Sequence, residues 1–176
     1  MLRFKFLKRK HLKMKCLVFS DSHGSSIYMS RAIELHPDAE VVFFLGDGLS
    51  DLERIADRYP DRAFIAVRGN CDHTSLFRNS TVEKTDSITL EGVKIVLTHG
   101  DLYSAKYGIG GLISLGVRES ADIVLFGHTH QPFEKYISDN ERPFYLFNPG
   151  SISPASASYG VITLRNGILL SHGTFL

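Results

Sequence analysis

The stretch KCLVFSDSHG, Lys15 to Gly24, joins a short apolar run to polar side chains that are common metal ligands. The run from Lys15 to Ser20 is rich in Val, Leu and Phe, which is typical of a buried strand. Asp21 and His23 follow it directly. Alone, an Asp-x-His sequence most simply caps the next helix. Its meaning therefore depends on how the other strands of the chain end.

Four more apolar runs predict strands at Val41 to Leu45, Ala63 to Val67, Val93 to Thr98 and Ile123 to Phe126. Between the first three strands the apolar residues recur at helical spacing, as with Tyr28, Ala32 and Leu35. We expect this first helix to be capped by Ser25 or Ser26 and to end before Pro37. The second helix covers Leu52 to Tyr59. Strands that alternate with helices favour a largely parallel sheet with helices against it.

The pattern changes after His130, where short segments are separated by turn residues. The predicted strands are Phe133 to Ile137, Pro143 to Phe147, Tyr159 to Leu164 and Ile168 to Ser171. Asn166-Gly167 marks a tight hairpin between the last two. We expect these segments to form a second, more antiparallel sheet.

Each of the first five strands is followed by polar side chains suited to metals. They are Asp21 and His23, then Asp47, Asn70 and His99, and finally His128 and His130. Sites in open α/β sheets form beyond the carboxyl ends of strands, so five loops would bring these seven side chains together. Oxygen and imidazole ligands suit Mn, Fe, Zn or Ni. Two ions about 3.5–4 Å apart that share one carboxylate would use all seven.

Each of these residues also has a simpler interpretation. Asp47 between two glycines and Asn70 after Gly69 are typical of turns. His128 and His130 could share one face of a strand or converge from a turn. The coincidence at five strand ends favours the metal site. The GIGG sequence at 108–111 lacks the Gly-Lys-Ser/Thr of a phosphate loop, so we interpret it as a flexible loop before a helix.

Five blocks carry a resemblance to a known family. In order they are DSHG (21–24), GDG (46–48), RGNCD (68–72), THGD (98–101) and GHTH (127–130). They resemble the signature blocks of the calcineurin-like metallophosphoesterases, particularly the small bacterial and archaeal phosphodiesterase branch. NPGSIS (148–153) also resembles a block of that branch. The match runs from about Met14 to the C-terminus and implies an α/β fold, a two-sheet αββα sandwich of mixed sheets with helices on the outer faces.

The resemblance also implies a function. Asp21, His23 and His130 would hold one divalent metal, and Asn70, His99 and His128 the other, with Asp47 bridging. The most favoured ion is Mn²⁺, with Ni²⁺, Fe²⁺ and Zn²⁺ as alternatives. A hydroxide bridging the two ions would attack a small phosphodiester. The alternatives are a phosphomonoesterase or phosphoprotein phosphatase, and a non-catalytic protein-interaction scaffold on the same fold.

Cys71 and Arg68 lie next to these predicted ligands. Related phosphoesterases often carry, in place of Cys71, a histidine thought to protonate the leaving oxygen, and a thiol is the weaker acid. We expect Cys71, with Asn70 and His99, to be catalytic, and Cys71 to tune which esters react rather than bind metal. Arg68 could contact a phosphate or form a structural salt bridge. Rim loops such as Asp72 to Glu83 and Leu102 to Gly111 would set specificity.

Composition limits the remaining possibilities. At 176 residues and 43% hydrophobic, the chain fits one domain, which we place at 14–176 with a basic N-terminal extension, 1–13, outside the fold. Residues 1–15 hold seven of the 20 basic residues, leaving 13 against 19 acidic ones. We therefore expect no stable binding to nucleic acid, no membrane span and a possible homo-oligomer. Cys16 and Cys71 form no disulfide framework, which favours a cytoplasmic protein.

Overall fold

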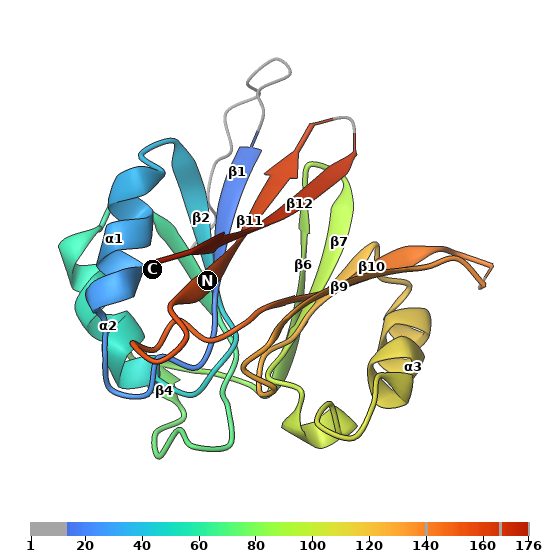
Figure 1. Cartoon of the computed structure of the whole chain (residues 1–176), viewed down its shortest axis with the longest axis horizontal. Coiled ribbons are helices and arrows are strands. Elements are labelled where there is room, and N and C mark those ends of the chain that lie inside the picture. Colours follow the sequence, from blue (N-terminus) through green and yellow to red (C-terminus); the bar gives the residue numbers. More distant parts are fainter. Residues whose placement is uncertain (1–13, 140, 166, 176) are drawn as a thin grey trace.

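The computed structural model describes residues 14–139, 141–165 and 167–175. Two five-stranded sheets pack face to face, with α1 and α2 outside one sheet and α3 outside the other (Figure 1). The predicted αββα sandwich is therefore confirmed. The predicted basic extension, 1–13, lies outside the described residues. No helix in the described part of the chain is long and apolar enough to cross a membrane.

The first sheet has the strand order β12-β11-β1-β2-β3. Its strands are β1 (Met14–Phe19), β2 (Ala39–Phe44), β3 (Ala63–Ala66), β11 (Ser158–Leu164) and β12 (Ile168–Thr174). β1, β2 and β3 run parallel, whereas β11 pairs antiparallel with both β1 and β12. The carboxyl ends of the three parallel strands therefore meet at one edge of the sheet.

The second sheet has the strand order β6-β7-β8-β10-β9. Its strands are β6 (Thr85–Leu90), β7 (Val93–Thr98), β8 (Ile123–Leu125), β9 (Pro132–Ile137) and β10 (Phe144–Pro149). β7, β8 and β10 are parallel, and β6 and β9 add antiparallel edges. A short hairpin of β4 (Leu76–Phe77) and β5 (Ser80–Thr81) lies apart from both sheets.

The prediction of which strands share a sheet was wrong. β7 and β8 do not extend the first parallel sheet but pair with β10 in the second. β11 and β12 return to the first sheet, where β11 lies beside β1. The physical reason is that β1 and β7 are apolar on both faces, so either sheet can bury them. The expected hairpin between β11 and β12 is confirmed, with Arg165 N–H donating to Gly167 O.

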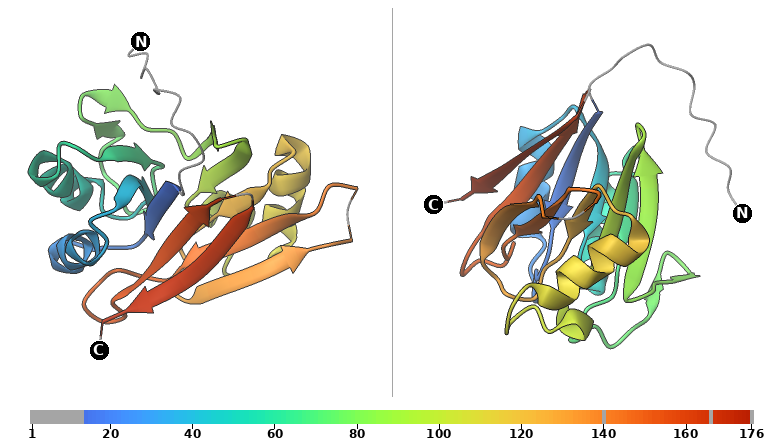
Figure 2. Two further views of the ribbon diagram at one scale, coloured as in Figure 1. Left: turned by 90° about the horizontal axis from the view of Figure 1, so that it is seen from above. Right: turned by 90° about the vertical axis from the view of Figure 1, so that its right-hand side faces the viewer.

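Alternate residues of the inner strands enter different cores. Between the sheets lie Cys16, Val18, Val41, Phe43, Ile95 and Leu97, among others. Their neighbours Leu17 and Phe19 face the other way, onto α1 and α2. On the far side Val96, Val124 and Leu146 pack against α3. This alternation produces the four layers seen from two more sides in Figure 2.

The helices begin and end near their predicted positions. α1 (Ile27–Leu35) ends before Pro37 as expected, and Ser26 occupies its N-cap position without a side-chain hydrogen bond. α2 spans Leu49–Arg58 and α3 spans Gly110–Glu119. A short 3-10 helix, η1 (Asp101–Tyr103), precedes α3. The predicted glycine loop at 108–111 therefore already contains the first turn of α3.

Candidate metal centre

The loops that follow β1, β2, β3, β7 and β8 gather at one end of the sandwich, at the bottom of Figure 1. Backbone hydrogen bonds tie neighbouring loops together, with Asp21 N–H donating to Gly46 O and Gly127 N–H donating to His99 O. The structure brings the seven predicted side chains together at this end. We call them the candidate metal centre: Asp21, His23, Asp47, Asn70, His99, His128 and His130.

Asp21 and two exposed histidines form one side of the centre. Asp21 Oδ1 lies 3.1 Å from Nε2 of His130 and 3.8 Å from Nε2 of His23. The two Nε2 atoms are 3.2 Å apart. The Asp21 carboxylate is fully buried, whereas both imidazoles reach solvent. Among the residues that the structure describes, these three form one of two groups close enough to hold a single ion.

His99 occupies the middle of the other side and is fully buried. Its Nε2 lies 3.3 Å from Asp47 Oδ2, 3.1 Å from Asn70 Oδ1 and 3.2 Å from His128 Nδ1. Its Nδ1 lies 2.7 Å from the carbonyl oxygen of Leu45. Because a carbonyl only accepts, Nδ1 carries a proton, and the neutral ring presents a lone pair at Nε2.

The donor set fits a pair of divalent cations. Asp21 Oδ1 is buried and has no hydrogen-bond partner among the described residues, although a buried carboxylate oxygen normally has one. Two pairs of imidazole nitrogens also face each other at 3.2 Å, in His23 and His130 and in His99 and His128. Two lone pairs at this distance repel unless a cation or a proton lies between them. The second close group is Asp21, Asp47 and His99. Asp21 therefore belongs to both groups. That Asp47 bridges the two metal ions stays a prediction.

Backbone strain is concentrated at the same place. Five of the seven residues have a positive φ: Asp21 at 56°, His23 at 47°, Asp47 at 59°, His128 at 67° and His130 at 61°. Such a conformation is uncommon outside glycine and costs free energy that the surrounding structure must offset. Strain of this kind clusters at functional sites.

Two glycines let the loops after β2 and β3 approach each other. A Cβ on Gly46 would overlap the backbone of Gly69, and a Cβ on Gly69 would overlap Asp47. Gly46 also has a φ of +97°. Side chains at either position would therefore separate Asp47 from Asn70.

Asp72 holds these loops in register, a role that sequence reasoning missed. Its Oδ1 accepts from the backbone N–H groups of Gly48 and Leu49, at 2.8 and 2.9 Å. Its Oδ2 accepts from those of Asp47 and Gly69, both at 2.9 Å. One carboxylate thus binds the first turn of α2 and both ligand-bearing loops. An aspartate just after the GNC sequence was the only available signal.

Three other polar side chains fix the remaining loops. Asp51 Oδ2 accepts from Ser22 Oγ and from Gly24 N–H, at 2.6 and 2.8 Å. Ser151 Oγ donates to Asp21 O at 2.8 Å, and Asn148 Nδ2 donates to Gly127 O at 2.9 Å. The NPGSIS block therefore supports the centre from behind.

Asp47 and His99 shift each other's titration in the metal-free protein. Burial acts to raise the pKa of Asp47, but the hydrogen bond and charge of His99 and the N–H of Cys71 lower it well below its ordinary value. Burial acts to lower the pKa of His99, but the hydrogen bond to Asp47 and the charges of Asp21 and Asp47 raise it. Burial and then the charges of His99 and Lys106 lower the pKa of His128.

Cys71 lies exposed at the edge of the centre, beside Asn70. Asn70 Nδ2 donates to Cys71 Sγ at 3.1 Å, and Cys71 N–H donates to Asp47 Oδ1 at 2.7 Å. A hydrogen bond with Asp47, partial burial and nearby carboxylates raise the pKa of the thiol. Arg68 donates its backbone N–H to Glu83 O, and its buried Nε has no partner in the described part of the chain. A phosphate contact by Arg68 stays a prediction.

The model of the calcineurin-like phosphoesterase superfamily domain matches residues 14–167. The chain belongs to this superfamily. The probable metallophosphoesterase YsnB of Bacillus subtilis is 30% identical over 158 residues, covering 87% of this chain and 86% of that protein. Superfamily membership and the candidate ligand groups support a hydrolase that uses divalent metals.

Solved structures of superfamily proteins share the fold. A predicted phosphoesterase from Streptococcus pneumoniae superposes with a TM-score of 0.73 at 25% identity, covering 93% of this chain and 90% of that one. Vacuolar Protein Sorting 29 from Cryptosporidium parvum gives 0.71 at 18% identity, covering 93% and 99%. An archaeal phosphodiesterase gives 0.70 at 20% identity, covering 92% and 100%. The last two likenesses show the fold alone.

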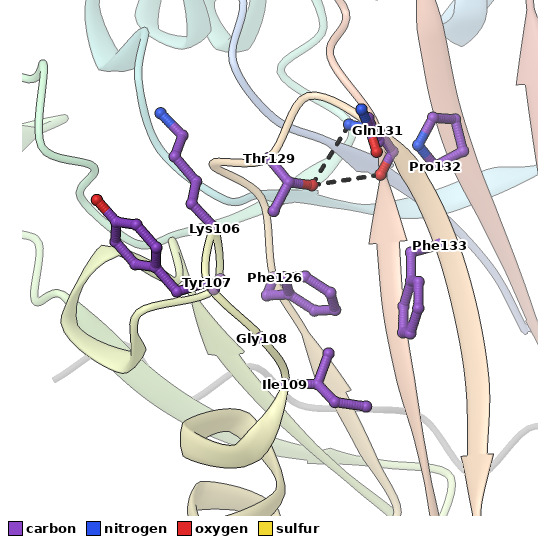
Figure 3. Close-up of a pocket in the computed structure, with 10 residues that line it drawn as sticks. Lys106, Tyr107, Gly108, Ile109, Phe126, Thr129, Gln131, Pro132 and Phe133 are labelled. Atoms are coloured by element: carbon purple, nitrogen blue, oxygen red, sulfur yellow. Dashed lines mark hydrogen bonds between the residues drawn. The ribbon is translucent and has the colours of Figure 1, made fainter.

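Two pockets are lined by residues of the loops that carry the candidate metal centre. The first has a volume of about 490 Å³, and its lining includes His23, Asp47 and Cys71 together with Asp51 and Asp72. The second has a volume of about 620 Å³ and lies between the loop before α3 and the start of β9 (Figure 3). The first is formed by loops of the first sheet and the second mainly by loops of the second sheet.

Proposed function

We propose that the chain is a metal-dependent phosphodiesterase that hydrolyses small diesters at a dinuclear centre. The observation that carries the proposal is that Asp21 Oδ1, a buried carboxylate oxygen without a hydrogen-bond partner among the described residues, lies 3.1, 3.8 and 4.0 Å from Nε2 of His130, His23 and His99. Asp21, His23 and His130 would hold one ion, as the family resemblance implies. Asn70, His99 and His128 would hold the other, with Asp47 shared.

Hydrolysis joins a water oxygen to phosphorus and breaks the bond from phosphorus to one ester oxygen. The water loses a proton and the departing alcohol gains one. Two divalent ions, when bound, would neutralise charge on the phosphoryl oxygens and lower the pKa of water. Leu45 O fixes the tautomer of His99, and Asp72 fixes the loop of Asp47, so the donors are held in place before metals bind.

Cys71 influences which leaving groups react. It is the exposed group beside Asn70 that could give a proton to the departing oxygen. Its raised pKa makes it a poor acid near neutral pH. Esters whose leaving groups depart without protonation, such as aryl esters, are therefore the expected substrates.

The presence of two pockets lined by loops of the centre favours a diester over a monoester. A diester has two substituents that each need space, whereas a monoester has one. The pockets of about 490 and 620 Å³ lie in the range of small-molecule sites. The structural neighbour described as an archaeal phosphodiesterase is consistent with this choice.

Hydrolysis of bis-p-nitrophenyl phosphate with Mn²⁺ or Ni²⁺ tests the proposal directly. We expect turnover that chelator abolishes, and an Asp47→Ala variant with activity reduced by about a thousandfold or more because a shared ligand is lost. Glu134→Gln, at an exposed position on β9, is the matched control and should retain activity. A folded protein that binds no metal and cleaves no ester with any divalent ion would overturn the proposal.

The same assay separates the alternatives. A phosphomonoesterase would cleave p-nitrophenyl phosphate faster than the diester. A scaffold would bind metal without turnover of either ester. We also propose that Mn²⁺ supports the highest activity and that the protein acts in the cytoplasm without stable nucleic-acid binding, and activity across Mn²⁺, Ni²⁺, Fe²⁺ and Zn²⁺ would rank the metals.

A further inference from the structure

We infer that the pocket between the loop before α3 and the start of β9 binds a planar aromatic arm of the substrate (Figure 3). This inference rests on the proposed function and deepens it, because it names the chemical class of one ester arm. The pocket is called the aryl pocket below. Its lining is Ala105, Lys106, Tyr107, Gly108, Ile109, Phe126, Thr129, Gln131, Pro132 and Phe133.

The aryl pocket adjoins the candidate metal centre. Thr129 lines the pocket and lies between His128 and His130 in the chain. Thr129 Oγ1 accepts from Asn148 Nδ2 at 3.1 Å, which fixes the loop that carries both histidines. A phosphorus atom at the centre would therefore place one of its substituents toward this pocket.

The chemistry of the lining favours an aromatic occupant. In Figure 3 the side chains of Ile109, Phe126 and Phe133 point toward one another from three segments. The rings of Phe126 and Phe133 meet edge to face, with centroids 5.9 Å apart. Ile109 and Phe133 are only partly buried and extend the core beneath α3 to the surface. A flat apolar group would cover this surface and could stack on the Phe133 ring, whereas Phe126 is only 2% exposed and supports that ring from beneath.

Charge distinguishes the aryl pocket from its neighbour across the centre. Among the described residues that line it, Lys106 is charged and none is acidic. The neighbouring pocket is lined by Asp47, Asp51 and Asp72. An anionic phosphoryl group with an apolar arm would therefore be attracted to the Lys106 side.

Tyr107 is the residue that tests this inference most cleanly. Its side chain lines the pocket and is 94% exposed, with its ring pointing away from Ile109, Phe126 and Phe133 in Figure 3, so it contributes little to the core. Substitution there should leave folding unchanged, and the exposed ring is free to turn onto a bound arm. Tyr136, 52% exposed on β9 and outside the pocket lining, offers a matched control.

The experiment compares competitive inhibition by diphenyl phosphate and dimethyl phosphate in the metal-loaded enzyme. Calorimetric titration of the same two compounds gives an independent measure of binding. For Tyr107→Ala we expect affinity for diphenyl phosphate to fall about fivefold to tenfold, the size of one aromatic contact. Affinity for dimethyl phosphate should stay constant. Tyr107→Phe should retain the wild-type preference, and Tyr136→Ala should leave both affinities unchanged.

The outcomes separate this inference from the proposed function. Equal losses for the two compounds in Tyr107→Ala, or no loss for either, would overturn the aryl pocket while turnover of esters continued. A wild-type enzyme that prefers dimethyl phosphate would do the same. Absence of turnover with every ester and metal would instead remove the proposed function, and the inference with it.

Discussion

At the residue scale, Asp72 connects more of the site than any predicted ligand does. Its two oxygens accept four backbone N–H groups from the loops of Asp47 and Gly69 and from the start of α2. Asp72 therefore positions the ligands without belonging to the predicted ligand set. Side chains that orient metal ligands typically affect affinity almost as much as the ligands themselves.

An Asp72→Asn variant tests this positioning role. The amide can accept at one atom only and places N–H donors against backbone N–H groups, so we expect metal affinity to fall about tenfold to hundredfold. The measurement is metal content after dialysis against graded chelator, with far-ultraviolet circular dichroism to confirm folding. Glu134→Gln, which also removes one carboxylate, should bind metal normally. Wild-type affinity in a folded Asp72→Asn protein would show that the four hydrogen bonds are not needed for positioning.

Cys71 gives the second prediction at this scale. Cys71→His should retain both metals, because the structure places the thiol beside Asn70 and outside the two close ligand groups. An imidazolium is the better proton donor near neutral pH. We therefore expect about a tenfold gain on alkyl esters relative to aryl esters, measured as the ratio of kcat/KM values. Loss of bound metal in Cys71→His would make Cys71 a ligand instead.

The sequence predicted the positions of the seven donors better than the residues that hold them. Each of the seven side chains follows an apolar run that predicts a strand. Because parallel strands end at the same edge of a sheet, the pattern alone predicted that these side chains converge. Asp72, Asn148 and Ser151 act on backbone atoms of loops that are distant in the chain. No periodicity encodes such contacts, because they depend on how two loops approach each other.

At the element scale, α3 packs closely on the second sheet because Gly116 has no side chain. A Cβ at this position would overlap the ring of Phe144, which is itself 1% exposed in β10. Helical propensity favours alanine over glycine by about 1 kcal/mol. Overpacking at a close contact typically costs about 1–3 kcal/mol.

We therefore expect Gly116→Ala to destabilise the protein by about 1–2 kcal/mol, despite the better helix former. Gly110→Ala at the start of the same helix is the control, since a Cβ there meets nothing within 4 Å. Urea unfolding of the metal-free proteins measures both changes. A Gly116→Ala protein as stable as Gly110→Ala would mean that Phe144 and α3 move apart at no cost.

Most strand positions could be predicted, whereas sheet membership could not. The predicted strand Val93 to Thr98 coincides with β7, and the other predicted strands differ from the observed ones by a few residues at their ends. The strand β6, whose pattern is less apolar, was not predicted. Short runs of Val, Ile and Leu identify burial on both faces. They do not identify a pairing partner. β8 pairs with β10, where each residue contacts one 22 positions further along the chain, such as Ile123 with Tyr145 (145 − 123 = 22). Pairing of that kind is decided by packing of whole layers.

At the scale of the whole molecule, the candidate metal centre joins the two sheets. Asp21, Asp47 and Asn70 follow strands of the first sheet, and His99 and His128 follow strands of the second. In the metal-free protein the Asp47–His99 contact of 3.3 Å crosses this interface. Metals and the Asp47–His99 ion pair would therefore stabilise the same arrangement of the two sheets. The ion pair depends on pH because it requires a protonated His99.

The direction in which stability changes with pH follows from the pKa shift of His99. Its pKa in the folded, metal-free protein is raised above the ordinary value near 6.5, mainly by Asp47 and Asp21 against the effect of burial. A raised folded pKa stabilises the protein below about pH 6.5, and this contribution is lost as pH rises through the folded pKa. The pKa of Asp47 is lowered on folding, so its contribution to the free energy of unfolding is constant above about pH 4. It therefore does not affect how stability changes between pH 6 and 8.5.

We therefore expect the metal-free protein to lose thermal stability between pH 6 and 8.5 more steeply than an Asp47→Asn variant does. The asparagine removes the charge that holds the proton on His99, so less of the stability depends on protonation. Thermal unfolding in chelator across this pH range measures the two slopes, and all other titrating groups are common to both proteins. Equal slopes would mean that Asp47 does not hold the proton on His99. In that case the contact of the two sheets at this end of the sandwich would depend on packing and on interactions without this charge, such as the hydrogen bond between His99 Nδ1 and Leu45 O.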